Sequence, residues 1–102
     1  MIPYVLARTA ERDLDTINTF LIADAGTIVA RRVLKAVEKA FNLLGEAPGV
    51  GHARRDLTNL PVKFWRVYSY LIVYDPDIRP VEIFRVLHGT RNIGAILKRT
   101  GQ

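Results

Sequence analysis

Basic and aromatic side chains are interleaved in the second half of the chain, and they are its best candidates for chemistry. Arginine and lysine bind phosphate or carboxylate groups, and aromatic rings stack on nucleobases. The pattern therefore suits RNA, with an acidic protein segment as the alternative partner. The residues of this set are Arg54, Arg55, Lys63, Trp65, Arg66, Tyr68, Tyr70, Tyr74, Arg85, His88 and Arg91.

Two arginines of the set, Arg66 and Arg85, each interrupt an otherwise apolar or aromatic run. A guanidinium in such a strand must be paired, or must open onto a face that meets a partner. In the simpler interpretation Arg66 pairs with Asp56 or Glu82, and the aromatic rings fill the core. The sequence leaves both interpretations open.

Motifs of the common enzyme classes are missing from the chain. It has no cysteine, no phosphate-binding glycine motif and no nucleophile elbow. His52 and His88 are too few for a zinc site, and we expect both to be structural or hydrogen-bonding residues. Asp75 and Asp77 flank a proline, which is typical of a turn. We therefore expect no metal and no cofactor.

Length and composition predict one small basic domain over residues 1–102. Hydrophobic residues make up 49% of the chain, which excludes a disordered protein, and no apolar run is long enough to span a bilayer. We expect a cytoplasmic protein. The net charge of +5 lies wholly in residues 52–102, which have nine basic and four acidic residues. Residues 1–51 have six basic and six acidic residues and are neutral. Such asymmetry indicates an acidic partner.

Helical spacing dominates the first half of the chain. A short strand is expected over Ile2–Leu6, followed by a helix that Thr9 caps and Gly26 ends. Thr27 caps a second helix, so the two form an antiparallel helical hairpin. The first helix has its apolar face at Ala10, Leu14, Ile17 and Leu21, with Arg12, Asp13, Asp15 and Asn18 largely elsewhere. The second has Ala30, Val33, Leu34, Val37, Ala40, Phe41 and Leu44, and ends at Gly45, Pro48 and Gly49.

The second half predicts a loop, three strands and a short helix. The loop covers Gly49–Pro61, and Asn92 caps the last helix. The strands are Val62–Tyr68, Tyr70–Tyr74 and Val81–His88. Short turns join them, so they must pair antiparallel, and the helical hairpin packs on one face. The fold is therefore α+β: an N-terminal strand, an antiparallel helical hairpin, a three-stranded antiparallel sheet and a short C-terminal helix.

Several stretches resemble the RelE/ParE superfamily, the toxins of bacterial and archaeal type II toxin–antitoxin modules. They are Gly-His-Ala-Arg-Arg-Asp-Leu at 51–57, Phe-Trp-Arg-Val-Tyr-Ser-Tyr-Leu-Ile-Val-Tyr at 64–74 and the segment 81–93. The most specific part is Arg-Val-Leu-His-Gly-Thr-Arg at 85–91, and Ala25-Gly26 before the second helix also fits. The resemblance runs nearly end to end and implies a fold with the element order given above.

The resemblance implies one of two activities. RelE-like members cleave messenger RNA in the ribosomal A site with basic side chains and often a tyrosine, whereas characterised ParE-like members poison DNA gyrase. This chain has Tyr70 where nucleases commonly have arginine, and no tyrosine in Gly94–Leu97. A nuclease would depend on Arg66, Arg85 and Arg91 for charge and on His88 for the proton. That set is thin, and the ParE-like branch is favoured.

The resemblance also implies partners. ParE-like toxins are neutralised by a ParD-like antitoxin whose acidic C-terminal segment wraps the toxin, giving a toxin–antitoxin hetero-oligomer. The +5 half suits such a segment first. The expected targets are DNA gyrase or, alternatively, the ribosome and messenger RNA; a third possibility is an inactive member that only binds its antitoxin. Target- or antitoxin-binding residues are expected at Arg54, Arg55, Lys63, Trp65, Arg66, Arg85, His88 and Arg91.

Overall fold

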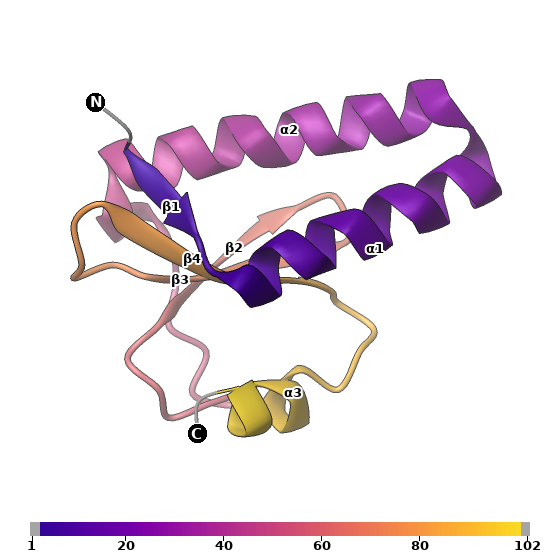
Figure 1. The fold of residues 1–102 in the computed structure, drawn as a ribbon. Helices are drawn as coiled ribbons and strands as arrows, with labels where there is room; N and C mark the ends of the chain where they lie inside the picture. The colour runs from indigo at the N-terminus through magenta and orange to yellow at the C-terminus, as the bar shows by residue number, and fades with distance from the viewer. Residues whose placement is uncertain (1–2, 101–102) are drawn as a thin grey trace.

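The computed structural model of the chain describes residues 3–100. Its elements follow the predicted order, with a short 3-10 turn, η1, added after the helical hairpin (Figure 1). The strand expected over Ile2–Leu6 is shorter, and Ile2 lies outside the described residues. The elements are β1 (Tyr4–Leu6), α1 (Arg8–Ala25), α2 (Thr27–Glu46), η1 (Pro48–Val50), β2 (Lys63–Val67), β3 (Tyr70–Asp75), β4 (Val81–His88) and α3 (Ile93–Thr100).

The four strands form one mixed sheet in the order β1-β4-β3-β2. As predicted, β2, β3 and β4 pair antiparallel through short turns. The prediction of a three-stranded sheet was incomplete, because β1 joins it in parallel beside β4, with Tyr4 opposite Val81. A parallel neighbour needs a long crossover, so it cannot be read from the short turns that reveal antiparallel pairs.

The sheet is covered on both faces. Figure 1 shows the helical hairpin α1–α2 over one face, as predicted, and α3 on the opposite side. Burial of the apolar stripes of α1 and α2 against one face produces the larger core, which includes Ile17, Val37, Phe41, Leu44, Ile72, Tyr74, Val81, Ile83 and Val86. A smaller core beneath α3 contains Val62, Phe64, Val73, Leu87, Ile93, Ile96 and Leu97.

The helix ends match the glycine and asparagine predictions but not the threonine ones. Gly26, at φ 92°, ends α1 and donates its N–H to the last-turn carbonyls, a conformation that favours glycine. Asn92 accepts the N–H of Ala95 at 3.3 Å before α3. Thr9 lies inside α1, which begins at Arg8 and has no side-chain cap. Thr27 is the first residue of α2, after Gly26, and does not cap it.

The N-terminal part of α1 continues along β4 where β1 ends. After Leu6 the Ala7 N–H still donates to the Ile83 carbonyl at 2.9 Å. The Thr9 hydroxyl then donates to the Phe84 carbonyl at 2.7 Å. Thr9 is thus bound to the strand rather than to its own helix. A buried carbonyl without a partner is costly. The Thr9 hydroxyl therefore supplies the hydrogen-bond donor that β4 lacks beyond the end of β1.

A tyrosine hydroxyl fixes the connection between α2 and the loop that follows it. Tyr74 donates to the Pro48 carbonyl at 2.6 Å and accepts the N–H of Gly51 at 3.0 Å. Beyond it, His52 pairs with Phe64 through both backbone hydrogen bonds. The segment predicted as an aperiodic loop therefore covers part of the outer edge of β2, which removes an exposed strand edge.

Candidate functional site

Arg85 on β4 forms an ion pair with Asp13 on α1. Its Nε donates to Asp13 Oδ2 at 2.7 Å, and its Nη2 donates to Oδ1 at 2.9 Å. The same carboxylate accepts the backbone N–H of Val86 at 3.0 Å. The two side chains are only 15% and 10% exposed. A carboxylate with two guanidinium donors and one backbone donor is well satisfied away from water, so the pair joins α1 to the sheet.

A basic cleft of about 370 Å³ opens where the β2–β3 turn meets the end of β4. Antiparallel pairing of β3 with β4 brings the β2–β3 turn next to the end of β4. The Gly89 N–H, directly after β4, donates to the Ser69 carbonyl of that turn at 2.8 Å. Four predicted site residues line it, from the loop, from β2, from β4 and from the turn after β4. The basic cleft comprises Arg54, Leu57, Arg66, Ser69, Leu71, His88, Gly89, Thr90, Arg91 and Ile93.

The arginines of the basic cleft differ in how far their charge is neutralised. Arg54 donates twice to Asp56, at 2.9 and 2.7 Å, and these hydrogen bonds hold the pKa of the Asp56 carboxyl below its usual value. The predicted pairing of Arg66 with Asp56 or Glu82 is therefore wrong. Arg66 instead donates from Nε to the Tyr68 carbonyl at 2.9 Å. Within residues 3–100 neither Arg66 nor Arg91 has a carboxylate within ion-pair distance.

His88 at the end of β4 contacts both a turn and a ring. Its Nδ1 lies 2.7 Å from the Thr90 hydroxyl and accepts the Thr90 backbone N–H at 3.2 Å. The ring meets Tyr70 edge-on, with centroids 5.3 Å apart. Because a backbone N–H can only donate, Nδ1 is an acceptor and the neutral ring carries its proton on Nε2. His88 thus presents a donor, and not a base, at Nε2.

Tyr68 begins the β2–β3 turn, whereas the sequence placed it at the end of a strand. It has φ 54° and is 58% exposed. Left-handed backbone is uncommon for residues other than glycine, asparagine and aspartate, and a bulky aromatic residue there is an outlier. The hydrogen bond from Arg66 to its carbonyl holds this conformation. Tyr68 is therefore an exposed aromatic residue, next in sequence to the cleft residue Ser69, in a conformation with a backbone cost.

The remaining predicted site residues lie apart from the basic cleft. Lys63 and Trp65 alternate with Arg66 along β2, so their side chains point to the hairpin face. Trp65 stacks on His52, with centroids 6.4 Å apart and planes 15° apart, and Lys63 Nζ lies 3.5 Å from the Gly51 carbonyl. Arg55 is exposed in the loop. The predicted basic and aromatic set is thus divided between two faces of the sheet.

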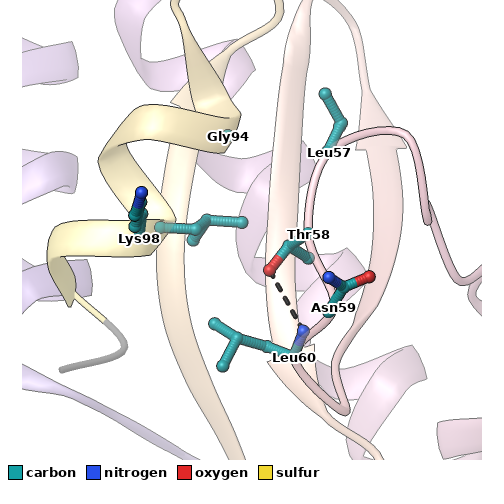
Figure 2. A pocket seen from close by; sticks show the side chains of 7 residues that line it. Leu57, Thr58, Asn59, Leu60, Gly94 and Lys98 are labelled. Carbon is teal, nitrogen blue, oxygen red and sulfur yellow. Dashed lines mark hydrogen bonds between the residues drawn. The ribbon is translucent and has the colours of Figure 1, made fainter.

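Two further hollows flank this region. One, of about 490 Å³, lies between the loop and α3. Figure 2 shows Thr58 and Leu60 on the side of the loop toward Lys98, with the Leu60 N–H donating to the Thr58 hydroxyl. The other, the apolar groove, is a hollow of about 300 Å³ between α1 and the sheet. The apolar groove is lined by Ile17, Phe20, Tyr70, Val86, Leu87 and the polar residues Asp13, Thr16, His88, Thr90 and Arg91.

Sequence reasoning missed the role of Asp13 and, although Tyr68 was among the candidate residues, the left-handed backbone of Tyr68. Asp13 was assigned away from the apolar face of its helix, yet it is 8% exposed and holds Arg85. Its spacing of four from Thr9 was an available signal, since both then lie on one helix face toward β4. No local pattern foretold the backbone of Tyr68, because neither glycine nor asparagine marks the turn. Within residues 3–100 no three His, Asp or Glu side chains gather as metal ligands.

A helical hairpin and a short helix enclosing a four-stranded sheet, with a basic cleft at its end, define a small α+β protein. None of its described helices combines the length and the apolarity needed to cross a membrane. The family model for the ParE toxin of the type II toxin–antitoxin system parDE matches residues 4–93, so the chain belongs to this family. It is a ParE-type toxin, and an antitoxin partner goes with that assignment.

A solved structure agrees with this fold. The chromosomal ParDE toxin–antitoxin system from P. aeruginosa contains a chain that superposes with a TM-score of 0.71 at 18% identity. The match covers 86% of this chain and 96% of that one. At such identity the likeness concerns the fold alone. No curated protein sequence matched the chain. The expected superfamily and its ParE-like branch are confirmed by the family match.

Proposed function

We propose that this ParE-type toxin arrests growth by inhibiting DNA gyrase, as a binding protein and not as a catalyst. The observation that carries the proposal is the Asp13–Arg85 ion pair. In the nuclease alternative Arg85 would face the phosphate of a cleaved RNA. Here its guanidinium donates twice to a buried carboxylate, so it supplies little charge to a phosphate in the cleft.

The proton-transfer groups also support a non-catalytic toxin. Attack by a ribose 2′-hydroxyl needs a base, and His88 offers a protonated Nε2 while Thr90 occupies Nδ1. Tyr70 stands where nucleases of the superfamily commonly have arginine, and it is buried at 7% exposure. Of the residues on which a nuclease would depend, Arg66 and Arg91 are then left as cations, and neither can act as the general base.

Induced expression in a bacterial host, followed by assays with purified toxin, tests this proposal. Gyrase inhibition predicts filamentation, DNA-damage signalling and loss of supercoiling by purified gyrase. Translation arrest with cut messages, abolished by His88→Ala, would contradict it and establish the ribosome-dependent nuclease. Unchanged growth would leave a chain that only binds its antitoxin. Arg79→Ala is the control for His88→Ala. Arg79 is exposed on the β3–β4 turn and lines neither the basic cleft nor the apolar groove, whereas His88 lines both.

We further propose that the antitoxin is a small ParD-like protein whose acidic C-terminal segment lies across the helical hairpin. The hairpin carries exposed apolar residues, among them Phe20, Ile22 and Ile28 at 57%, 43% and 73% exposure. A segment that folds on binding needs apolar surface to offset its ordering entropy. The apolar groove, which Phe20 lines, supplies such surface. Arg91 and His88 line the same groove and suit the acidic residues of the segment. Both partners would place the toxin in a prokaryotic cytoplasm.

Co-purification with the product of a neighbouring open reading frame tests the antitoxin proposal. If that product binds, Phe20→Ser should weaken the complex by about tenfold or more, as loss of a central aromatic anchor does. Ile78→Ser is the matched control, because Ile78 is 47% exposed on the β3–β4 turn. Equal losses in the two variants would contradict the assigned surface, and no binding at all would contradict the antitoxin.

A further inference from the structure

We propose that the hollow between the loop and α3 binds a small amphiphilic carboxylate, a molecule with one carboxylate group and a short alkyl chain. This α3 hollow is lined by loop residues 57–60 and by Gly94, Leu97 and Lys98. It shares no residue with the apolar groove and only Leu57 with the basic cleft. The proposal therefore depends neither on gyrase inhibition nor on antitoxin binding, and each can fail without the others.

The α3 hollow has the size of a ligand site, and its loop wall is fixed by hydrogen bonds. Its volume of about 490 Å³ lies within the range of about 300–1,000 Å³ that is typical of small-molecule sites. The N–H groups of Leu57 and Thr58 both donate to the Arg54 carbonyl, at 2.9 and 3.1 Å. The Leu60 N–H donates to the Thr58 hydroxyl at 3.1 Å (Figure 2). A wall that is already ordered loses little conformational entropy when a ligand binds.

A glycine sets how closely the two walls of the α3 hollow approach each other. A Cβ at Gly94 would lie 2.9 Å from the Leu57 carbonyl oxygen, which is closer than ordinary contact. Because that oxygen belongs to the backbone, a side chain at this position would push the loop away from α3. The width of the hollow therefore depends on Gly94.

Three leucines give the α3 hollow an apolar side. Leu97 is buried in the smaller core, whereas Leu57 and Leu60 pack against that core and are only half-buried. Apolar surface of this kind is removed from water when an alkyl chain covers it. Each buried methylene group raises affinity by up to about fourfold.

Lys98 and Thr58 give the same hollow the groups that one carboxylate needs. Within residues 3–100 no carboxylate lies within ion-pair distance of Lys98, and neither aspartate nor glutamate from that range lines the hollow. The Thr58 hydroxyl accepts a hydrogen bond from Leu60, so its own proton can be donated to a ligand. Among the described residues no aromatic ring lines the hollow, so it offers no stacking surface for a nucleobase. One lysine and one hydroxyl beside three leucines thus indicate an amphiphilic monoanion.

Isothermal titration calorimetry of the purified full-length toxin with octanoate, octanol and octylamine tests the class of ligand. The three probes share an alkyl chain and differ in charge, and all are used at submicellar concentrations. We expect octanoate to bind most tightly and octylamine most weakly, because Lys98 attracts only the anion. Affinity should also rise from butanoate to hexanoate to octanoate, by up to about fourfold for each added methylene group.

Variants of the charge and of the wall assign the site. Lys98→Met should weaken octanoate binding about fivefold, the modest effect of losing an ion pair with an exposed lysine, and should leave octanol binding unchanged. Arg99→Met is the matched control, because Arg99 is the next residue of α3, is exposed and does not line the hollow. Leu60→Ala should weaken the binding of both octanoate and octanol. Leu43→Ala is its control, since Leu43 lies on α2 at 40% exposure. Circular dichroism checks the fold of every variant.

Amide signals of the ¹⁵N-labelled toxin locate the bound ligand, and we expect octanoate to shift those of residues 57–60 and 94–98. Four outcomes would overturn the proposal. The first is no binding of octanoate, and the second is equal binding of octanoate, octanol and octylamine. The third is an equal loss in Lys98→Met and Arg99→Met, which would indicate attraction by net charge only. The fourth is a set of shifts confined to the residues of the apolar groove, which would place the ligand in that groove instead.

Discussion

The Asp13 carboxylate on α1 lies 2.7 Å from Arg85 Nε on β4, across 72 residues of sequence. β1 pairs with β4 only as far as Leu6, and α1 follows it along the sheet. The ion pair joins α1 to β4 beyond the end of β1. It gives a polar, specific link between the helical hairpin and a central strand. The consequences of this link can be measured as changes in the free energy of unfolding.

Asp13→Ala should be strongly destabilising, because it leaves a buried guanidinium without its carboxylate. We expect a loss of about 3–5 kcal/mol in urea denaturation. The double variant Asp13→Leu/Arg85→Met should recover much of this loss, since apolar side chains of similar size remove both charges. A double variant as unstable as Asp13→Ala would contradict this explanation, because the loss would then come from the missing link between α1 and β4 and not from a guanidinium left without its carboxylate.

Thr9→Val should destabilise the protein by about 1–2 kcal/mol, because the Phe84 carbonyl loses its hydrogen-bond donor while the side-chain shape is retained. Thr9→Ser is the control, since it keeps the hydroxyl that lies 2.7 Å from that carbonyl. Thermal unfolding of both variants tests whether α1 completes the edge of β4. If valine is tolerated as well as serine, the hydroxyl is not needed there.

Tyr74→Phe should lower stability by about 1–2 kcal/mol at neutral pH, through loss of the bonds to Pro48 and Gly51. Burial raises the pKa of the Tyr74 phenol, an effect that the Gly51 N–H partly offsets. With its pKa higher in the folded state, the tyrosine binds its proton more tightly there, so stability falls as the pH rises above about 10. This alkaline fall should be shallower in Tyr74→Phe, and an equal slope would contradict the assignment.

Gly51→Ala and Gly49→Ala should have opposite effects. A Cβ at Gly51 would overlap the Tyr74 hydroxyl, so alanine should cost about 1–3 kcal/mol. A Cβ at Gly49 meets no described atom within 4 Å, and alanine should stabilise by about 0.4–1 kcal/mol through the unfolded chain. Differential scanning calorimetry of the two variants checks both signs. A stable Gly51→Ala protein would mean that the loop is not fixed by Tyr74.

Local patterns in the sequence predicted the elements well where the periodicity was strong. The strand Val81–His88 has the predicted bounds, and Gly26 separates the two helices as expected. The caps at Thr9 and Thr27 were wrong because a threonine before a helical run also fits positions inside the helix. That residues 1–102 form one domain stays a prediction.

Arg66 and Arg85 show the boundary between sequence and tertiary structure. Each is an arginine in an apolar strand, so by itself the sequence determined that each needs a partner or an open face. It also determined that the basic charge lies in the second half. Only the tertiary structure decided the difference: β4 is central and meets Asp13 on α1, whereas β2 is an edge strand. The neutralising carboxylate comes from a distant helix whose place is set by sheet order and packing, which local residue patterns do not encode.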